Sequence, residues 1–424
     1  MNYSRFLTSL ALSRKPSPIR ELTKLLVSAS PDLIFLAGGV PNPELFPFKS
    51  LSVSLDDGSE IQLNSNDIKS ALQYTETRGY PNLVKHLKEL QKYLHEPPST
   101  TDWEIVVTNG SQDGLCKAME MLVDHGDYVL LEEPCYAGTL SILHPYKPKW
   151  LPLSGDKDGL IPSSLKQALD NYKGKDTGSP IEKGPKILYL NPNGANPTGT
   201  SISTPRRYEI YKLAQKYDLL ILEDDPYYFL QFGEEKSPSF LSLDTDGRVL
   251  RFDSFSKILS SGLRLGFVTG PKELVERINL HMQVSVLHAS TLSQVLVSQL
   301  FDRWKIDGFL SHSSKVSTFY EKQRDHMAAA AEKHLKGLVE WHMPSGGMFL
   351  WMKCLHVEDT KAMIMERALP KDIILLPGQA FMTDPNKASP FMRAAFSLAT
   401  PEKMDIGFAK LAELIREEIQ LQRK

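Results

Sequence analysis

Short apolar runs alternate with amphipathic stretches between residues 104 and 270. The runs are rich in Val, Ile and Leu, which is typical of strands that are buried on both faces of a sheet. Stretches with helical spacing lie between them, at 115–123 and 206–217. Because strands that alternate with helices form a mostly parallel sheet, the pattern predicts an α/β domain. The predicted strands are 104–109, 128–133, 186–191, 219–224, 248–254 and 263–270.

The pattern changes from about residue 285 onward. Helical periodicity covers 317–335 and 401–420, and three runs with strand character lie between them, at 348–354, 372–377 and 391–399. These elements predict a smaller α+β domain. We therefore expect three parts, namely an N-terminal segment at 1–40, a large domain at 41–285 and a small domain at 286–424 to which the N-terminal segment contributes.

Composition and charge narrow the class of function. The chain has 424 residues, of which 41% are hydrophobic and 24% charged, and its net charge is −2. A near-neutral chain has no overall field that attracts nucleic acid, and no apolar run approaches the roughly 18 residues of a membrane span. We expect neither partner. The 11 histidines form no H-E-x-x-H pair, so no metal site is predicted.

The first twenty residues are basic and carry no acid before Glu21. Apolar Phe6, Leu7, Leu10 and Leu12 are interspersed with the arginines, as in a mitochondrial transit peptide. The same pattern fits an amphipathic arm that stays in the mature fold. The sequence leaves both interpretations open, so we expect the mitochondrial matrix, with the cytoplasm as the alternative.

Polar residues follow the predicted strands at five places. Ligands of an open parallel sheet bind at the carboxyl ends of its strands, so these residues should converge on one crevice. Ser111 and Gln112 stand at a helix start, which favours a phosphate group, and Tyr136 offers a flat stacking surface. Asp224 ends a very apolar strand and needs a partner for its charge. The residues at the five ends are Ser111, Gln112, Tyr136, Asn196, Asp224, Tyr227, Ser254, Ser256, Lys257 and Arg264.

One ligand would satisfy this whole set. Its phosphate would bind at Ser111, Gln112, Ser254, Ser256 and Arg264, and its flat ring would lie under Tyr136. A protonated ring nitrogen would suit Asp224, a ring oxygen would suit Asn196 and Tyr227, and an aldehyde would react with Lys257. Pyridoxal phosphate has all these groups, and its enzymes supply a Schiff-base lysine and an acid for the ring nitrogen.

The sequence resembles the fold type I pyridoxal-phosphate aminotransferases. The likeness rests on five motifs spread over most of the chain, and its narrower part is to the mitochondrial branch that acts on L-kynurenine and L-2-aminoadipate. The five motifs are "NGSQDG", "NPTG" (196–199), "EDDPYY" (223–228), "SFSKILSSGLRLG" (254–266) and "FMRAAFS" (391–397). The narrower likeness rests on "SPIREL" (17–22), "LAGGVPNPELFPF" (36–48) and "ALQYTETRGYP" (71–81).

The resemblance implies a role for each matched residue. Lys257 matches the lysine that binds the cofactor covalently and moves the substrate α-proton, and Asp224 matches the partner of the ring nitrogen. Arg393 matches the anchor of the substrate α-carboxylate, a task that suits the bidentate guanidinium group. The other residues implied to bind substrate are Arg20, Gly39, Tyr74, Tyr136 and Asn196. Tyr74 resembles a tyrosine from the second subunit, so the resemblance implies a homodimer with shared active sites. It also implies that the segment 1–40 is an arm over the active site.

Transamination with 2-oxoglutarate or another 2-oxo acid as acceptor is the implied reaction, with broad tolerance for amino-acid donors. The same scaffold also supports β-lyase chemistry, and aminotransferase-like domains occur as ligand-sensing parts of transcription regulators. One departure from the family pattern lies before "NPTG", where "NPNGANPTG" is two residues longer than usual. It makes the shape of that loop less predictable.

Overall fold

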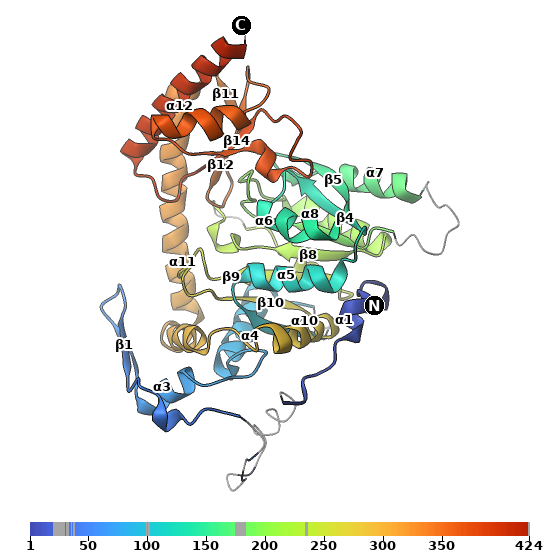
Figure 1. Ribbon diagram of the computed structural model, residues 1–424, viewed down its shortest axis with the longest axis vertical. Coiled ribbons are helices and arrows are strands. Elements are labelled where there is room, and N and C mark those ends of the chain that lie inside the picture. Colours follow the sequence, from blue (N-terminus) through green and yellow to red (C-terminus); the bar gives the residue numbers. More distant parts are fainter. Residues whose placement is uncertain are drawn as a thin grey trace. The chain divides into compact units, whose positions relative to one another are not determined.

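The computed structural model describes residues 1–19, 30, 34, 36, 39–98, 100, 102–173, 184–233 and 236–422 (Figure 1). The chain separates into two compact units, and each is made of two segments. Unit 1 contains Met1–Asp124 and Ser239–His312, and unit 2 contains His125–Pro238 and Ser313–Lys424. The predicted domain boundaries, at residues 40 and 285, stay predictions.

The sheet strands of unit 1 are β3 (Trp103–Thr108), β10 (Gly266–Pro271) and β9 (Val249–Ser254). β10 lies between the other two and runs antiparallel to both, with Gly266 opposite Thr108 and Ser254. Helices α5 (Ser111–Leu122) and α10 (Lys272–Ser285) pack against these strands and against each other (Figure 1). The predicted strands 104–109, 248–254 and 263–270 are thus confirmed, although the last begins at Gly266.

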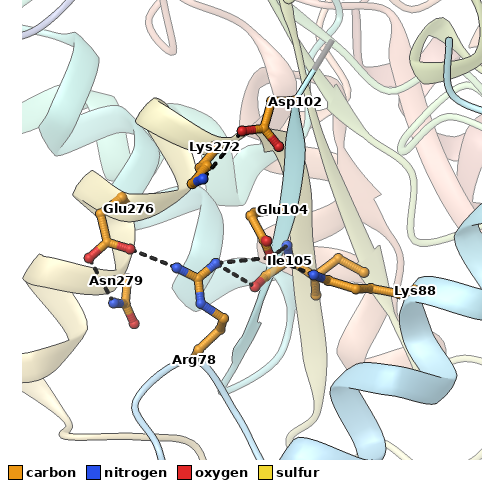
Figure 2. A network of polar contacts seen from close by, with 8 residues as sticks. All are labelled: Arg78, Lys88, Asp102, Glu104, Ile105, Lys272, Glu276 and Asn279. Atoms are coloured by element: carbon orange, nitrogen blue, oxygen red, sulfur yellow. Dashed lines mark hydrogen bonds and ion pairs between the residues drawn. The ribbon is translucent and has the colours of Figure 1, made fainter. Parts of the chain in front are cut away.

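A polar network joins three elements of unit 1. Arg78 precedes α4 (Pro81–His95), and its guanidinium group lies between Glu104 of β3, at 3.2 Å, and Glu276 of α10, at 2.7 Å (Figure 2). Lys88 of α4 pairs with the same Glu104 at 2.9 Å. Each charge is only partly exposed, and a network of such pairs holds its geometry better than an isolated surface pair.

The N-terminal segment is part of unit 1. Its short elements are η1 (Tyr3–Arg5) and α1 (Ser9–Ser13), and between them Phe6 is fully buried. The Tyr3 hydroxyl donates to the Gly247 carbonyl at 2.8 Å, and the Thr8 amide donates to the Met121 carbonyl of α5 at 2.9 Å. Residues 1–17 therefore contribute side chains to the core of unit 1 and hydrogen bonds that join this segment to the rest of the unit.

The remaining elements of unit 1 lie between the N-terminal segment and α4, before β9, or in the first part of α11 (Thr291–Leu335), which continues into unit 2 from Ser313. A hairpin of β1 and β2 packs its apolar side on α3 and the first part of α11, which includes Val295. Helix α11 has non-helical backbone at Lys305 (φ 51°) and begins well before the predicted helix at 317–335. The bounds are η2 (Pro43–Leu45), β1 (Leu51–Ser54), β2 (Glu60–Leu63), α3 (Ser65–Ala71), α9 (Phe240–Leu243) and α11 (Thr291–Leu335).

Unit 2 contains two sheets. In the first, strands lie in the order β8, β7, β4, β5, β6, and the first four run parallel. The predicted strands 128–133, 186–191 and 219–224 correspond to β4, β7 and β8. The bounds are β4 (Tyr128–Glu133), α6 (Ala137–Leu143), η3 (His144–Tyr146), β5 (Lys149–Asp156), β6 (Gly159–Leu160), α7 (Pro162–Lys173), β7 (Ile187–Leu190), α8 (Thr204–Lys216), β8 (Leu220–Asp224) and η4 (Tyr228–Leu230).

The second sheet is antiparallel, in the order β11, β12, β14, β13, and its apolar side packs on α12. The strand predicted at 372–377 is wrong for its first four residues, because Asp372 takes a left-handed conformation that ends the turn before it. The strand predicted at 391–399 ends at Ala395. The bounds are β11 (Val339–Trp341), β12 (Phe349–Cys354), η5 (Met363–Ala368), η6 (Leu369–Lys371), β13 (Leu376–Pro377), η7 (Gly378–Phe381), β14 (Phe391–Ala395) and α12 (Pro401–Gln422).

Candidate functional site

The start of α5 in unit 1 is built to present backbone N–H groups. Gly110 precedes the helix with φ 80°, a conformation that suits glycine, and Ser111 and Gln112 are the first two helical residues. Asp113 accepts a hydrogen bond from the Asn109 amide at 3.1 Å, which fixes the turn. The first N–H groups of a helix have no partner within it, and together with the helix dipole they attract an anion.

Three side chains at the end of β9 and after it lie beside this helix start. The Ser256 amide donates to Ser254 Oγ at 3.2 Å, and Arg264 Nη1 donates to Ser256 Oγ at 3.4 Å. Arg264 Nη2 also donates to the Asn109 carbonyl at 3.2 Å. Arg264 itself has a left-handed backbone (φ 49°), which is unusual for a residue with a side chain and costs free energy. Such strain is often found where a side chain serves a ligand.

Two glycines make room for this arrangement. A Cβ on Gly110 would lie 2.5 Å from Arg264 Nη2, and a Cβ on Gly266 would lie 2.6 Å from the Ser111 amide nitrogen. The arginine and the helix start can therefore approach each other only because these positions have no side chain. Lys257 comes directly after Ser256 and is half-buried. Unit 1 thus brings together hydroxyls, helix N–H groups and an arginine, in a cradle that fits a phosphate, with an amine next to it in the chain.

A buried ion pair supports the strand that carries Ser254. Arg251 Nη2 donates to Asp253 Oδ1 at 2.8 Å, and Gln91 Nε2 of α4 donates to Asp253 Oδ2 at 3.0 Å. His95 of the same helix is buried, and burial, with a smaller contribution from the Arg251 charge, holds the pKa of His95 well below its usual range. The hydrogen bond between Gln91 and Asp253 holds β9 against α4.

Asp224 ends β8 in unit 2 and is almost fully buried. The Tyr189 hydroxyl of β7 donates to Asp224 Oδ2 at 2.7 Å, and Asn191 Nδ2 donates to the Asp224 carbonyl oxygen at 2.6 Å. Burial, and next the Asp224 charge, raise the pKa of Tyr189 well above its usual range, so the phenol stays a hydrogen-bond donor. A buried carboxylate with a neutral donor beneath it is suited to a cationic partner.

Sequence reasoning missed Tyr189. It is the only aromatic residue in the aliphatic strand β7, and Leu222 lies opposite it in β8. Residues two apart in a strand share a face, so Tyr189 lies on the side of the sheet on which Asp224 follows Leu222. A tyrosine among aliphatic residues, aligned with the strand that ends in the carboxylate, was the available signal.

Asn196 lies where three groups meet in unit 2. Its side-chain oxygen Oδ1 accepts a hydrogen bond from Arg393 Nη1 at 2.7 Å. Its backbone N–H donates to Asn191 Oδ1 at 2.7 Å. A side-chain hydrogen bond also joins Asn196 to Tyr227, whose pKa burial raises. The carboxamide therefore orients both the arginine and the phenol.

The longer loop before Asn196 packs tightly against the turn before β12. Gly194 has φ 50°, and a Cβ on it would lie 2.2 Å from the Gly347 amide nitrogen. The Ser345 amide also donates to the Gly199 carbonyl at 3.0 Å. The two glycine-containing loops thus touch backbone to backbone, which sequence reasoning did not foresee.

Tyr136 is the residue before α6 and is half-buried. Its ring lies over Gly138, where a Cβ would be 2.4 Å from the ring carbon Cε1. Burial, and next the charge of Asp224, raise the pKa of Tyr136, while Arg393 opposes this shift. Unit 2 therefore brings together Tyr136, Asn196, Asp224, Tyr227 and Arg393.

The structure gives few contacts for the three other residues that are predicted to bind substrate. Tyr74 is 53% exposed and packs edge-on against the His288 ring, with centroids 5.8 Å apart. Gly39 has open space where a Cβ would be. Arg20 lies outside the described residues. In the part of the chain that the structure describes, no cluster of three His, Cys, Asp or Glu residues could hold a metal ion, and no helix is long and apolar enough to cross a membrane.

Comparison with known proteins adds a full-length likeness. The family model described as aminotransferase class I and II matches residues 52–411. The chain is 50% identical to a protein of Bos taurus named kynurenine/alpha-aminoadipate aminotransferase, mitochondrial, over 99% of this chain and 100% of that protein.

Solved structures show the same fold. The crystal structure of aminotransferase Aro8 from Candida albicans is similar with a TM-score of 0.87 and 27% identity, over 99% of both chains. The kynurenine aminotransferase of Pyrococcus horikoshii, solved with PMP and with KYN and KYA, is similar with a TM-score of 0.76 and 30% identity, over 98% of both chains. The fold is α/β, with a mostly parallel sheet and a smaller antiparallel sheet toward the C-terminus.

Proposed function

Because this chain belongs to the class I and II aminotransferase family, we propose that it transfers the amino group of L-kynurenine and L-2-aminoadipate to a 2-oxo acid such as 2-oxoglutarate. The observation that carries the proposal is the full-length likeness to a relative of that name. The cofactor is pyridoxal 5'-phosphate, in keeping with the family. The substrates of such an enzyme are amino acids and 2-oxo acids.

Each unit, taken by itself, holds residues that fit a part of this cofactor. In unit 1 the glycines that clear space between Arg264 and the start of α5 leave a cradle for a phosphate. We propose that Ser111, Gln112, Ser254, Ser256 and Arg264 bind the phosphate group. In unit 2 the buried Asp224 would pair with the ring nitrogen, Asn196 and Tyr227 would bind the ring hydroxyl, and Tyr136 would cover the ring.

When bound, the cofactor supplies a ring that accepts electrons from the substrate α-carbon. The chain supplies the rest. Lys257 would hold the cofactor through its amine and, once released, move the α-proton, because an amine beside the substrate can act as a general base. Asp224, which accepts a hydrogen bond from the Tyr189 hydroxyl, would hold a proton on the ring nitrogen. Arg393 would bind the substrate α-carboxylate, and Gly39, Tyr74 and Arg20 would complete the substrate pocket.

We further propose a homodimer in the mitochondrial matrix. Unit 1 exposes large apolar side chains, including Leu45 at 82% and Phe48 at 63%, and contact with a second copy of the chain would cover them. The curated relatives with about half of their residues identical are named mitochondrial. The cytoplasm stays the alternative, since the basic N-terminal segment is also a structural part of unit 1.

The proposal is tested with a panel of amino donors, 2-oxoglutarate as acceptor, and measurement of each oxo acid. L-Kynurenine and L-2-aminoadipate should be among the best donors. Ammonia released from the donor alone would instead indicate β-lyase chemistry, because transamination keeps the nitrogen.

Lys257→Ala should abolish turnover, with a loss of several orders of magnitude, because it removes the proposed base and cofactor anchor. Lys272→Ala is the matched control, since Lys272 is an exposed lysine of the same unit that pairs with Asp102. Full activity in the Lys257 variant would show that the assignment is wrong.

A further inference from the structure

Arg393 lies close to two phenylalanine rings of unit 2. Its guanidinium carbon is 4.2 Å from the centroid of the Phe349 ring and 5.1 Å from that of Phe381. Phe349 begins β12 and Phe381 ends η7. Trp351 lies directly opposite Arg393 across the strand pair, so Phe349 is its diagonal neighbour on the same face. We call Phe349 and Phe381 the ring pair.

Other aromatic residues hold the ring pair in place. Phe381 packs edge-on against Trp351, with centroids 5.5 Å apart, and Trp351 stacks on Phe391 at 5.3 Å. Phe349 packs edge-on against Tyr227 at 5.8 Å. Both rings of the pair are buried. The orientation of each ring is therefore set by its neighbours.

The backbone of Phe381 is also tied to the segment that carries Tyr136. Its carbonyl accepts a hydrogen bond from the Cys135 amide at 2.8 Å. Two residues later the Thr383 amide donates to Glu133 Oε1 at 2.8 Å. The end of η7 is thus fixed to the end of β4, and Phe381 cannot shift independently of Tyr136.

The contacts with the ring pair use the guanidinium group of Arg393 without using its N–H groups, which stay able to donate hydrogen bonds. Nη1 donates to Asn196 Oδ1, while the buried Nε makes no hydrogen bond with the described residues. A ring on a guanidinium face attracts the cation without using any of its N–H groups. Burial lowers the pKa of Arg393, and the attraction to the rings offsets part of the cost of burying the charge. A cation that is shielded from water binds a carboxylate more strongly.

We infer that Phe349 and Phe381 are positioning residues that hold Arg393 for the carboxylate of its ligand. The inference rests on the proposed function, which assigns the substrate α-carboxylate to Arg393. The ring pair then sets the affinity for every substrate that carries this group, both amino donor and 2-oxo acid. It should not change the chemical step, because the rings lie against the arginine rather than the reacting atoms.

The test replaces Phe381 with Leu and with Tyr in the full-length holoenzyme. Phe381→Leu should raise KM about tenfold for both L-2-aminoadipate and 2-oxoglutarate, with kcat within about twofold, since a desolvated cation–π contact is worth roughly a factor of ten in affinity. The Kd of 2-oxoglutarate for the pyridoxal phosphate form, measured by calorimetry, should rise by the same factor. Phe381→Tyr keeps the ring and should restore most of the affinity.

Phe408→Leu is the matched control, because Phe408 is a buried phenylalanine of α12 in the core of the same unit and is not one of the rings described above as packing on the ring pair. It should lower Tm and leave both KM values within about twofold of wild type. Equal KM values in the Phe381→Leu and Phe408→Leu variants, or an effect on kcat alone, would overturn the inference. If Phe381→Leu does not fold, Phe349→Leu tests the other ring with the same expected result.

Failure of the proposed function gives a different outcome. A wild-type holoenzyme without turnover on any amino donor would contradict transamination, yet its Kd for 2-oxoglutarate could still be compared between variants. Wild-type turnover with an unchanged Kd in Phe381→Leu would contradict the ring pair alone.

Discussion

The hydrogen bond that Tyr189 donates to Asp224 makes a single phenol part of the proposed cofactor site. A carboxylate in the interior is costly to bury without donors, and the strand neighbour provides one. The phenol would then help Asp224 to act as the partner of the ring nitrogen of the proposed cofactor.

Tyr189→Phe should lower kcat about tenfold, because a hydrogen bond to a buried charged group contributes roughly 1.5–3 kcal/mol. Asp224→Asn removes the charge itself and should lower kcat by orders of magnitude, while cofactor still binds. Steady-state kinetics and cofactor titration measure both variants. Wild-type kcat in Tyr189→Phe would show that the phenol is only a packing residue.

The N-terminal segment is the clearest case in which one element of the chain has two interpretations. Its basic, acid-free character indicates a transit peptide, while the structure buries Phe6 and joins Thr8 to α5. Import signals need no tertiary contacts, so these contacts are evidence of a structural contribution.

Phe6→Ala should reduce the free energy of unfolding by about 3–5 kcal/mol, as expected for a fully buried phenylalanine. Leu10→Ala in the same segment is the control, since Leu10 is 49% exposed, and it should change stability by less than about 0.5 kcal/mol. Denaturant unfolding followed by fluorescence compares the two variants. Equal stabilities would mean that the segment does not stabilise unit 1.

Strong apolar runs made most strands predictable, and β4 was predicted at its observed bounds, 128–133. The short strand β6 was beyond reach, because two residues carry no periodicity and its pairing is decided by tertiary contacts. The strand-end residues of the site were predictable for the opposite reason, since polar residues directly after apolar runs stand out. Phe349 and Phe381 looked like ordinary core residues, and their distance to Arg393 depends on how the small sheet is paired.

The proposed homodimer with shared sites predicts that two inactive variants can complement each other in a hybrid dimer. If Lys257 and Tyr74 of one site come from different subunits, then Lys257→Ala and Tyr74→Ala chains are each defective alone. A hybrid dimer of the two has one site with both defects and one intact site.

Mixing equal amounts of the two variants under exchange conditions should restore about a quarter of the wild-type activity, because random pairing makes half of the dimers hybrid. Light scattering confirms the dimer mass, and each variant mixed with itself is the control. A dimer whose mixture gains no activity would contradict the sharing of sites, and a fully active monomer would contradict the dimer.

The buried N-terminal segment also sets an order of events for a chain that is to be imported. A receptor for targeting signals needs the apolar side of the helix, but Phe6 and Leu7 are covered once unit 1 has folded. Translocation and folding therefore compete for the same side chains, and the outcome depends on which is faster. A chain that folds before import buries its targeting signal and stays in the cytosol. The folding rate in the cytosol would therefore set the distribution of the protein between the cytosol and the mitochondrial matrix.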